Sequence, residues 1–323
     1  MTDPAGPPTP VLETAARELA DATAPHPRIY ELPPVQGREI LNDLQSGEDV
    51  ERPDADEEWV TVPGGPTGTV RVRILRPRGL TGDLPVMLYL HGAGWVFGDE
   101  RSHDRLVREL AAGAGVAAAY PLYSLAPEAR YPTAVEQCYT VGRWLAEEGA
   151  AHGLDGSRIA VCGDSSGGTL ATAVALLATE RGDLPLRAQV LLYPVTDANF
   201  ETMSYLEFSD GYYLTRDAMR WFWDQYAPDQ EQRSEIFASP LRAPVERLSG
   251  LPPTLVITGE ADVLRDEGEA YAAKLRAAGV DVTAVRVLGV VHDFLMLDTQ
   301  RHQNGTRTAR HLAVHALRTA LDT

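Results

Sequence analysis

A regular alternation of short apolar runs with helical patterns is the feature that most constrains how this chain folds. The continuous apolar runs, each as long as a strand buried on both faces, lie at 86–90, 116–120, 159–162, 190–193 and 255–258. Helical spacing occurs between and after them, at 101–112, 133–148, 169–180 and 267–278. One more strand pattern, at 282–287, precedes a last helix at about 305–321. This alternation predicts the α/β class, with a mostly parallel central sheet and helices on both faces.

Two segments depart from the alternation. The first fifty residues have helical spacing at 11–22 and 37–45, and an antiparallel hairpin pattern follows at 59–62 and 70–75. About sixty residues then separate the run that ends at Tyr193 from the next one, more than an ordinary crossover needs. This insertion is rich in aromatic residues, and Thr215 is placed to cap a helix within it. We interpret the insertion as a cap over a pocket.

The charge and the cysteines exclude several classes of protein. With 29 basic and 46 acidic residues the formal net charge is −17, so the chain repels nucleic-acid phosphates and anionic lipid surfaces. No run of eighteen apolar residues occurs, and the Pro-rich start at 1–10 has the pattern of neither a signal peptide nor an anchor. Cys138 and Cys162 fall in different predicted elements, so we expect free buried thiols in a reducing compartment. We therefore predict a cytoplasmic protein with no nucleic-acid or membrane partner.

The sequence GDSSG at 163–167 is the first chemical signal. A strand leads into it and a helix of small residues leads out, which is the context of a nucleophile elbow. In that context the glycines allow a sharp turn, and the turn lifts the Ser165 hydroxyl to the carboxyl edge of the sheet. We therefore predict that Ser165 is a nucleophile. The alternative is that GDSSG is an ordinary Gly/Ser loop with no catalytic role.

A serine nucleophile needs a base, and the base needs an acid to orient it. His292 follows the last predicted strand, and Asp262 follows the strand at 255–258, so both fall at the same sheet edge as Ser165. The order Ser, Asp, His is that of the α/β hydrolases. Glu260 and Asp266 have similar spacing and stay open as rival acids on this reasoning.

The sequence HGAGW at 91–95 directly follows the strand at 86–90. Small residues after a strand allow backbone N–H groups to face a developing oxyanion. We expect Gly92, Ala93 and Ser166 to provide a three-donor oxyanion hole.

These motifs together resemble those of the bacterial hormone-sensitive-lipase family of esterases, family IV, and the resemblance implies the α/β-hydrolase fold. The similar segments are HGAGW (91–95), YSLAPE (123–128), GDSSGG (163–168), DVLRDEG (262–268) and HDF (292–294), within about residues 55–320. The resemblance selects Asp262 over its two rivals. The chain departs from the family pattern at Ala93, where glycine is usual, and at Asp293, where glycine is common.

The resemblance also implies a division of the chain. Residues 1–50 would be the N-terminal helical part of a cap, 51–197 and 239–323 two parts of the α/β-hydrolase core, and 198–238 the cap insertion. It implies substrate contacts for four side chains, those of Trp95, Tyr193, Leu264 and Val291. Family members often dimerise through the last strand, around 282–287, and the composition does not decide whether this chain is a homodimer.

The implied function is that of a serine carboxylesterase acting on short- to medium-chain acyl esters through an acyl-enzyme. No metal or organic cofactor is implied, because the chain has no HExxH motif, cysteine cluster or phosphate loop. The partner would be a small-molecule ester. An amidase or deacetylase with the same triad stays open. A non-catalytic ligand-binding homologue is a further alternative, which the presence of His292 disfavours because the similar plant gibberellin receptors lack that histidine.

Overall fold

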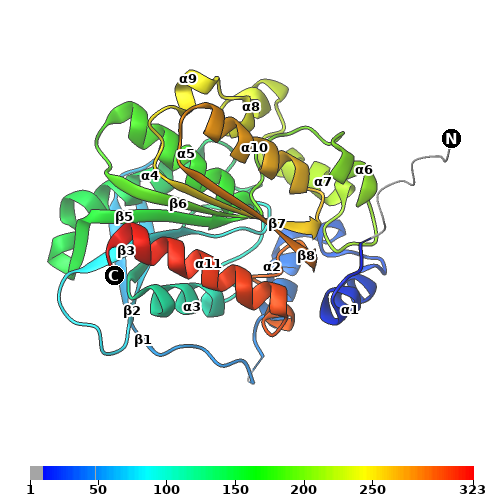
Figure 1. The fold of residues 1–323 in the computed structure, drawn as a ribbon, viewed down its shortest axis with the longest axis horizontal. Coiled ribbons are helices and arrows are strands. Elements are labelled where there is room, and N and C mark those ends of the chain that lie inside the picture. The colour runs from blue at the N-terminus through cyan, green and yellow to red at the C-terminus, as the bar shows by residue number, and fades with distance from the viewer. Residues whose placement is uncertain (1–9, 48) are drawn as a thin grey trace.

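One eight-stranded sheet runs through the computed structural model, which describes residues 10–47 and 49–323 (Figure 1). Its strands are β1 (Ala55–Pro63), β2 (Thr69–Pro77), β3 (Leu84–Leu90), β4 (Ala117–Leu122), β5 (Leu154–Asp164), β6 (Leu186–Leu192), β7 (Thr254–Ala261) and β8 (Val282–Val291). They lie in the order β1-β2-β4-β3-β5-β6-β7-β8. β2 pairs antiparallel with β1 and β4, and all other pairs are parallel. The predicted α/β fold is therefore confirmed, including the antiparallel hairpin.

Five long helices cover the sheet: α3 (Asp104–Ala114), α4 (Thr133–Glu148), α5 (Ser166–Arg181), α10 (Arg265–Ala277) and α11 (Asn304–Leu321). In Figure 1, α3 and α11 lie together on one side of the strands, and α4, α5 and α10 lie on the other. Every residue of β3 is buried, as is α5 from Ser166 to Ala178. A helix that is apolar all round belongs in an interior, and α5 indeed packs against β5 and β6.

The remaining elements are short and lie mostly outside the sheet layers. From the N-terminal side come α1 (Thr14–Thr23), η1 (Ile29–Glu31) and α2 (Pro34–Leu44). The segment between β6 and β7 holds α6 (Met203–Glu207), α7 (Arg216–Tyr226), α8 (Gln230–Ser234), η3 (Pro240–Arg242) and α9 (Val245–Leu248). Two further turns are η2 (Gly149–His152) and η4 (Asp298–Gln300). Figure 1 shows α1, α6 and α7 at the same end of the molecule.

Several local predictions can be compared directly. Thr215 caps α7, because its hydroxyl accepts a hydrogen bond from the Ala218 N–H at 3.0 Å. Cys138 and Cys162 are free and buried, as expected. The Pro-rich start lies, except for Pro10, outside the described residues. Within residues 10–47 and 49–323, no helix is both long enough and apolar enough to cross a bilayer.

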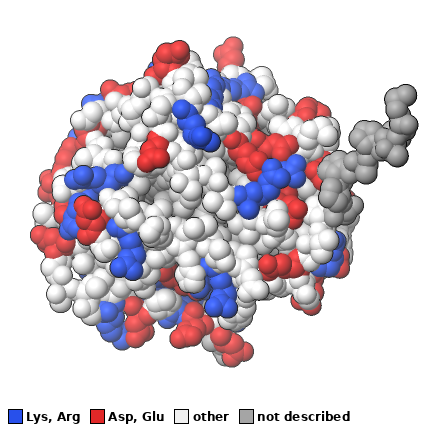
Figure 2. Space-filling view, viewed as in Figure 1, with Lys and Arg blue, Asp and Glu red and all other residues white. Residues whose placement is uncertain are grey.

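Charged side chains of both signs are interspersed on the face shown in Figure 2. The acidic excess is thus spread on this face. Repulsion from anionic polymers follows from the net charge of −17.

Candidate active site

The turn between β5 and α5 holds Ser165 in a strained backbone conformation. Its φ of 52° and ψ of −121° lie where few residues other than glycine are found. Two glycines make the close packing possible. A Cβ atom at Gly167 would lie 2.0 Å from the Leu90 carbonyl oxygen, and one at Gly163 would lie 2.2 Å from the Gly167 carbonyl oxygen. This is the sharp turn that the GDSSG sequence predicts.

Three side chains from three different loops meet at this turn. The Ser165 Oγ lies 2.9 Å from His292 Nε2, and His292 Nδ1 lies 2.7 Å from Asp262 Oδ2. The other Asp262 oxygen accepts a hydrogen bond from the Leu264 N–H at 2.9 Å. All three side chains are buried to 96% or more, so the chain of hydrogen bonds is shielded from water. The sequence-predicted Ser, His and Asp are therefore brought together in hydrogen-bonding order.

The two rival acids point elsewhere. Glu260 accepts a hydrogen bond from the Gly289 N–H at 2.7 Å, and Asp266 accepts one from the Ser204 N–H at 2.7 Å. Of the three acids considered from the sequence, Asp262 is the one that contacts His292.

The environment of His292 favours its protonated form. Burial lowers the pKa of His292, but the Asp262 and Asp293 carboxylates raise it by more, to about 9. The Tyr193 ring packs edge-on against the imidazole, with 5.0 Å between ring centroids. Tyr193 therefore packs against the imidazole of His292, the predicted general base, and helps to hold its orientation.

The loop after β3 corrects one prediction. The Gly92 N–H donates to Asp164 Oδ1 at 3.0 Å, inside the protein, so Gly92 is not free to donate to a substrate oxyanion. Ala93 and Gly94, with φ of 71° and 67°, line the cavity beside Ser165 instead. Sequence position alone could not assign these donors, because the left-handed backbone turns successive N–H groups in different directions.

A buried polar network beneath the nucleophile was not predicted. Asp164 accepts hydrogen bonds from the Tyr89 hydroxyl at 2.7 Å and from the Gly92 N–H, and its other oxygen lies 3.2 Å from His103 Nε2. Burial by itself would raise the pKa of Asp164, but His103 and Tyr89 hold it below its usual value. His103 is fully buried beside this carboxylate.

A cavity of about 560 Å³ opens above Ser165 and His292. Its walls are mostly apolar and come from α1, η1, α2, the loop at 93–97 and the segment 213–222. The four predicted substrate contacts are absent from its lining: Trp95, Tyr193, Leu264 and Val291. Each is at least 99% buried, and Trp95 is occupied in stacking on Tyr226 at 4.1 Å between centroids. Their burial and their absence from the cavity lining do not favour direct contact with a substrate, and the four assignments stay predictions.

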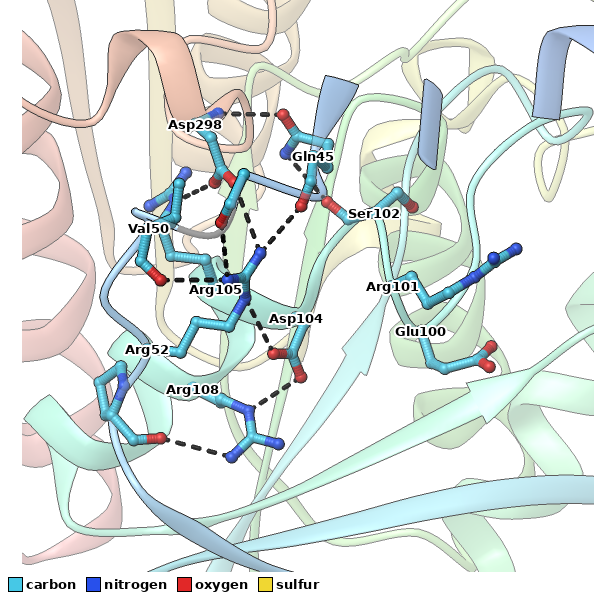
Figure 3. Close-up of polar contacts among 12 residues, drawn as sticks. Gln45, Val50, Arg52, Glu100, Arg101, Ser102, Asp104, Arg105, Arg108 and Asp298 are labelled. Carbon is cyan, nitrogen blue, oxygen red and sulfur yellow. Dashed lines mark hydrogen bonds and ion pairs between the residues drawn. The ribbon is translucent and has the colours of Figure 1, made fainter. Parts of the chain in front are cut away.

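The loop that carries His292 is held by a buried arginine on α3, Arg105, which Figure 3 shows beside Asp298. The Arg105 guanidinium donates to Asp298 Oδ1 at 2.5 Å, to the Leu295 carbonyl at 2.7 Å and to the Met296 carbonyl at 2.8 Å. Its side chain is 2% exposed. The planar guanidinium thus holds a carboxylate and two carbonyls in the residues that follow His292.

The end of α2 is tied to the same loop. Gln45 Nε2 donates to the Met296 carbonyl at 2.7 Å. Figure 3 shows two further contacts, in which Nε2 donates to the Ser102 carbonyl at 3.0 Å and Oε1 accepts from the Asp298 N–H at 3.0 Å. The N-terminal helices and the histidine loop are therefore joined through buried hydrogen bonds.

No described group of three or more His, Cys, Asp or Glu side chains is arranged to hold a metal ion. The chemistry available at the site is that of a hydroxyl, an imidazole, carboxylates and backbone N–H groups.

Comparisons with known proteins find similar sequences and similar folds. A family model described as alpha/beta hydrolase fold matches residues 87–296. A putative alpha/beta hydrolase of Acanthamoeba polyphaga mimivirus is 36% identical over 307 residues, covering 95% of this chain and 88% of that protein. An ethyl acetate hydrolase of Pseudomonas putida is 42% identical over 234 residues, covering 71% of this chain and 72% of that protein. The crystal structure of a thermostable esterase from Pseudomonas putida superposes with a TM-score of 0.92, 43% identity and coverage of 98% and 99%.

Proposed function

This chain belongs to the alpha/beta hydrolase fold family and is a carboxylic ester hydrolase, and from that premise we propose that it is a serine esterase with Ser165 as its nucleophile. The observation that carries the proposal is the buried hydrogen-bond chain from Ser165 through His292 to Asp262, which opens into an apolar cavity. The motifs at 91–95, 123–128 and 262–268 support placing it within the hormone-sensitive-lipase type.

The reaction proceeds in two halves. His292 accepts the Ser165 proton as the oxygen attacks the ester carbonyl, and Asp262 holds the tautomer with Nδ1 protonated. His292 then gives the proton to the leaving alcohol, which departs and leaves Ser165 acylated. Water, deprotonated by His292, attacks the acyl-enzyme and releases the acid.

The tetrahedral oxyanion would be held by backbone N–H groups at the head of α5 and in the loop after β3. We propose Ser166, Ala93 and Gly94 for this role. The cavity position of Ala93 and Gly94 beside Ser165 supports it, as does the position of Ser166 at the positive end of α5.

The substrate would be a short- to medium-chain acyl ester. The 560 Å³ cavity has an apolar lining, which favours binding of an alkyl chain. We also propose that residues 1–50 and 198–238 form a cap on a core made of 51–197 and 239–323. The contribution of Leu19, Leu41, Met219 and Phe222 to the cavity supports this division.

Two statements about the whole protein remain proposals. The free buried thiols of Cys138 and Cys162 support a cytoplasmic location. A homodimer through the edge strand β8 is open to test by light scattering, and the 64% exposure of Leu288 on that strand supports it.

Turnover of p-nitrophenyl butyrate by wild type and by Ser165→Ala tests the nucleophile. We expect kcat to fall by roughly 10⁴-fold or more, since loss of a triad member removes the covalent route. Ser157→Ala, at an exposed serine, is the matched control and should keep wild-type activity. Near-full activity of Ser165→Ala would overturn the assignment. Faster cleavage of p-nitrobutyranilide than of the ester would favour the amidase alternative.

A further inference from the structure

Asp293 is a second carboxyl group beside the catalytic histidine, and the mechanism above does not use it. Its Oδ1 lies 3.3 Å from His292 Nε2, the nitrogen that also faces Ser165. The Asp262 carboxylate lies behind the ring at Nδ1, whereas Asp293 is on the cavity side and lines the cavity. Asp293 therefore lies where substrate must bind.

This carboxyl group is buried and incompletely satisfied. Asp293 is 6% exposed, and its Oδ1 accepts no hydrogen bond from the part of the chain that the structure describes. His292 Nε2, which lies 3.3 Å from this oxygen, also faces Ser165, so a ligand that supplies a further donor or a positive charge to Oδ1 gains there.

The backbone at Asp293 points to the same conclusion. Its φ of 60° is a left-handed conformation that glycine adopts without strain. Aspartate adopts this conformation more readily than most residues, and with it the chain places a carboxyl group on the cavity wall where glycine would leave none.

The cavity around Asp293 favours cations over anions. Among its described lining residues, Glu18 and Asp293 are acidic, and Arg28 is already paired with Asp210 at 2.6 Å. His292 also lines the cavity, and it is neutral in the form that acts as a base. The Tyr213 phenol is close enough to Asp293 that burial and this carboxylate raise its pKa well above the usual value. Aromatic rings beside a carboxylate are a favourable setting for an ammonium group.

Geometry fixes the end of the substrate that reaches Asp293. The leaving oxygen must approach His292 Nε2 to about 3 Å to receive its proton. It then lies within about 6 Å of the Asp293 Oδ1, because that oxygen is 3.3 Å from the same nitrogen. A group one or two carbons along the alcohol can therefore contact the carboxylate.

We propose that Asp293 is a specificity-determining residue that selects esters of amino alcohols, in which an ammonium group lies two carbons from the ester oxygen. The inference rests on the proposed serine-esterase mechanism and adds a substrate class to it. The alcohol side binds its cation between Asp293 and Tyr213, and esters with a carboxylate at that position are disfavoured by repulsion.

The protonation of Asp293 predicts a pH dependence that gives a second test of the proposal. Burial raises the pKa of Asp293 to about 6, with the His292 imidazole opposing the rise and Asp164 adding to it. The titratable groups around it are His292, Tyr213, Asp164, His103 and Asp262. Selection of cations should be present above pH 6 and lost as the pH falls below it.

The test compares two acetates of nearly the same shape, 2-(dimethylamino)ethyl acetate, which is protonated at pH 7, and 3-methylbutyl acetate. We expect the wild-type kcat/KM ratio of the cationic to the neutral ester to be roughly tenfold or more, the size of one charge-assisted contact. Ionisation of His292 cancels in this ratio, so the ratio can be followed from pH 8 to pH 5.

Two variants separate charge from folding. Asp293→Asn keeps the shape without the charge, and Asp293→Gly removes the side chain at a backbone angle that glycine tolerates. Both variants should bring the kcat/KM ratio of the cationic to the neutral ester close to one. Asp217→Asn, at an exposed aspartate of α7, is the control and should keep the wild-type ratio.

A wild-type ratio near one, or a high ratio retained in Asp293→Asn, would overturn the specificity role while leaving the esterase proposal intact. If wild type hydrolyses neither these acetates nor p-nitrophenyl butyrate, the esterase proposal itself fails, and this inference fails with it.

Discussion

Replacing Arg105 with methionine should loosen the loop that carries the catalytic histidine. Methionine keeps much of the arginine's apolar stem but removes every donor. Three acceptors in the residues after His292 then lose their partner, namely Asp298 Oδ1 and the carbonyls of Leu295 and Met296. Asp298 is 3% exposed, so water cannot readily replace the guanidinium.

The expected loss of stability follows from that burial. Removing one partner of a buried ion pair lowers the free energy of unfolding by about 3–5 kcal/mol. Each buried carbonyl left without a donor costs about 1–3 kcal/mol more, although Gln45 still serves Met296. Because such losses are not additive, we expect the free energy of unfolding to fall by about 4 kcal/mol.

Urea unfolding followed by circular dichroism measures this change, and kcat for p-nitrophenyl butyrate measures its effect on His292. Arg101→Met is the matched control, because its side chain is 67% exposed and its ion pair with Asp99 should contribute less than about 1 kcal/mol. Arg105→Lys should recover only part of the loss, since one ammonium cannot match the fork of a guanidinium. A loss below about 1 kcal/mol in Arg105→Met would refute the energetic reasoning, and an unchanged kcat would refute the positioning role.

Four further predictions concern the site. Ala93→Gly should keep activity and add up to about 1 kcal/mol to the free energy of unfolding, because glycine adopts the φ of 71° without strain. Ala93→Pro should abolish activity, because proline cannot adopt that angle and has no N–H. Kinetics and urea unfolding of both variants check this. His292 must be neutral to act as a base, and its pKa is raised to about 9, so kcat/KM should rise with pH towards 9. Asp293→Asn should lower the midpoint pH of this rise. An unchanged midpoint would contradict the contribution of Asp293 to the pKa of His292. The same raised pKa stabilises the fold below about pH 6.5, and that stabilisation should be lost as the pH rises through about 9. In a series of p-nitrophenyl esters from acetate to palmitate, kcat/KM should be highest for an acyl chain of eight carbons or fewer, because each methylene contributes roughly 0.8 kcal/mol to binding only while it is buried. A maximum at twelve acyl carbons or more, or activation by an oil–water interface, would contradict this prediction.

The sequence was informative wherever chain order determines position. Parallel strands end at one edge of a sheet, so Ser165, His292 and an acid that follows the strand at 255–258 could be predicted to meet there. Strand order left three acids open, and the family resemblance selected Asp262. The capping of α7 by Thr215 was similarly predictable, because an N-cap depends on a local hydrogen bond.

Side-chain and N–H directions beyond the strand ends were not predictable. Gly92 was expected to contribute to the oxyanion hole, but its N–H donates to Asp164. Trp95 was expected in the cavity, yet its ring stacks on Tyr226. Such outcomes depend on torsion angles and long-range packing, which motif spacing does not encode.

The burial of His103 escaped prediction for a related reason. A histidine near a helix start has no periodicity that distinguishes a buried position from a surface one. Its partner Asp164 is 61 residues away in sequence, and only the folded sheet brings the two together.

Covalent labelling tests the central claim most directly. Diethyl p-nitrophenyl phosphate phosphorylates an activated serine, and mass spectrometry of the intact protein and of its peptides locates the adduct. We predict one adduct, on Ser165, formed at a rate that falls sharply in His292→Ala, and none in Ser165→Ala. An adduct on another residue, or rapid labelling of Ser165→Ala, would contradict the assignment of Ser165 as the nucleophile.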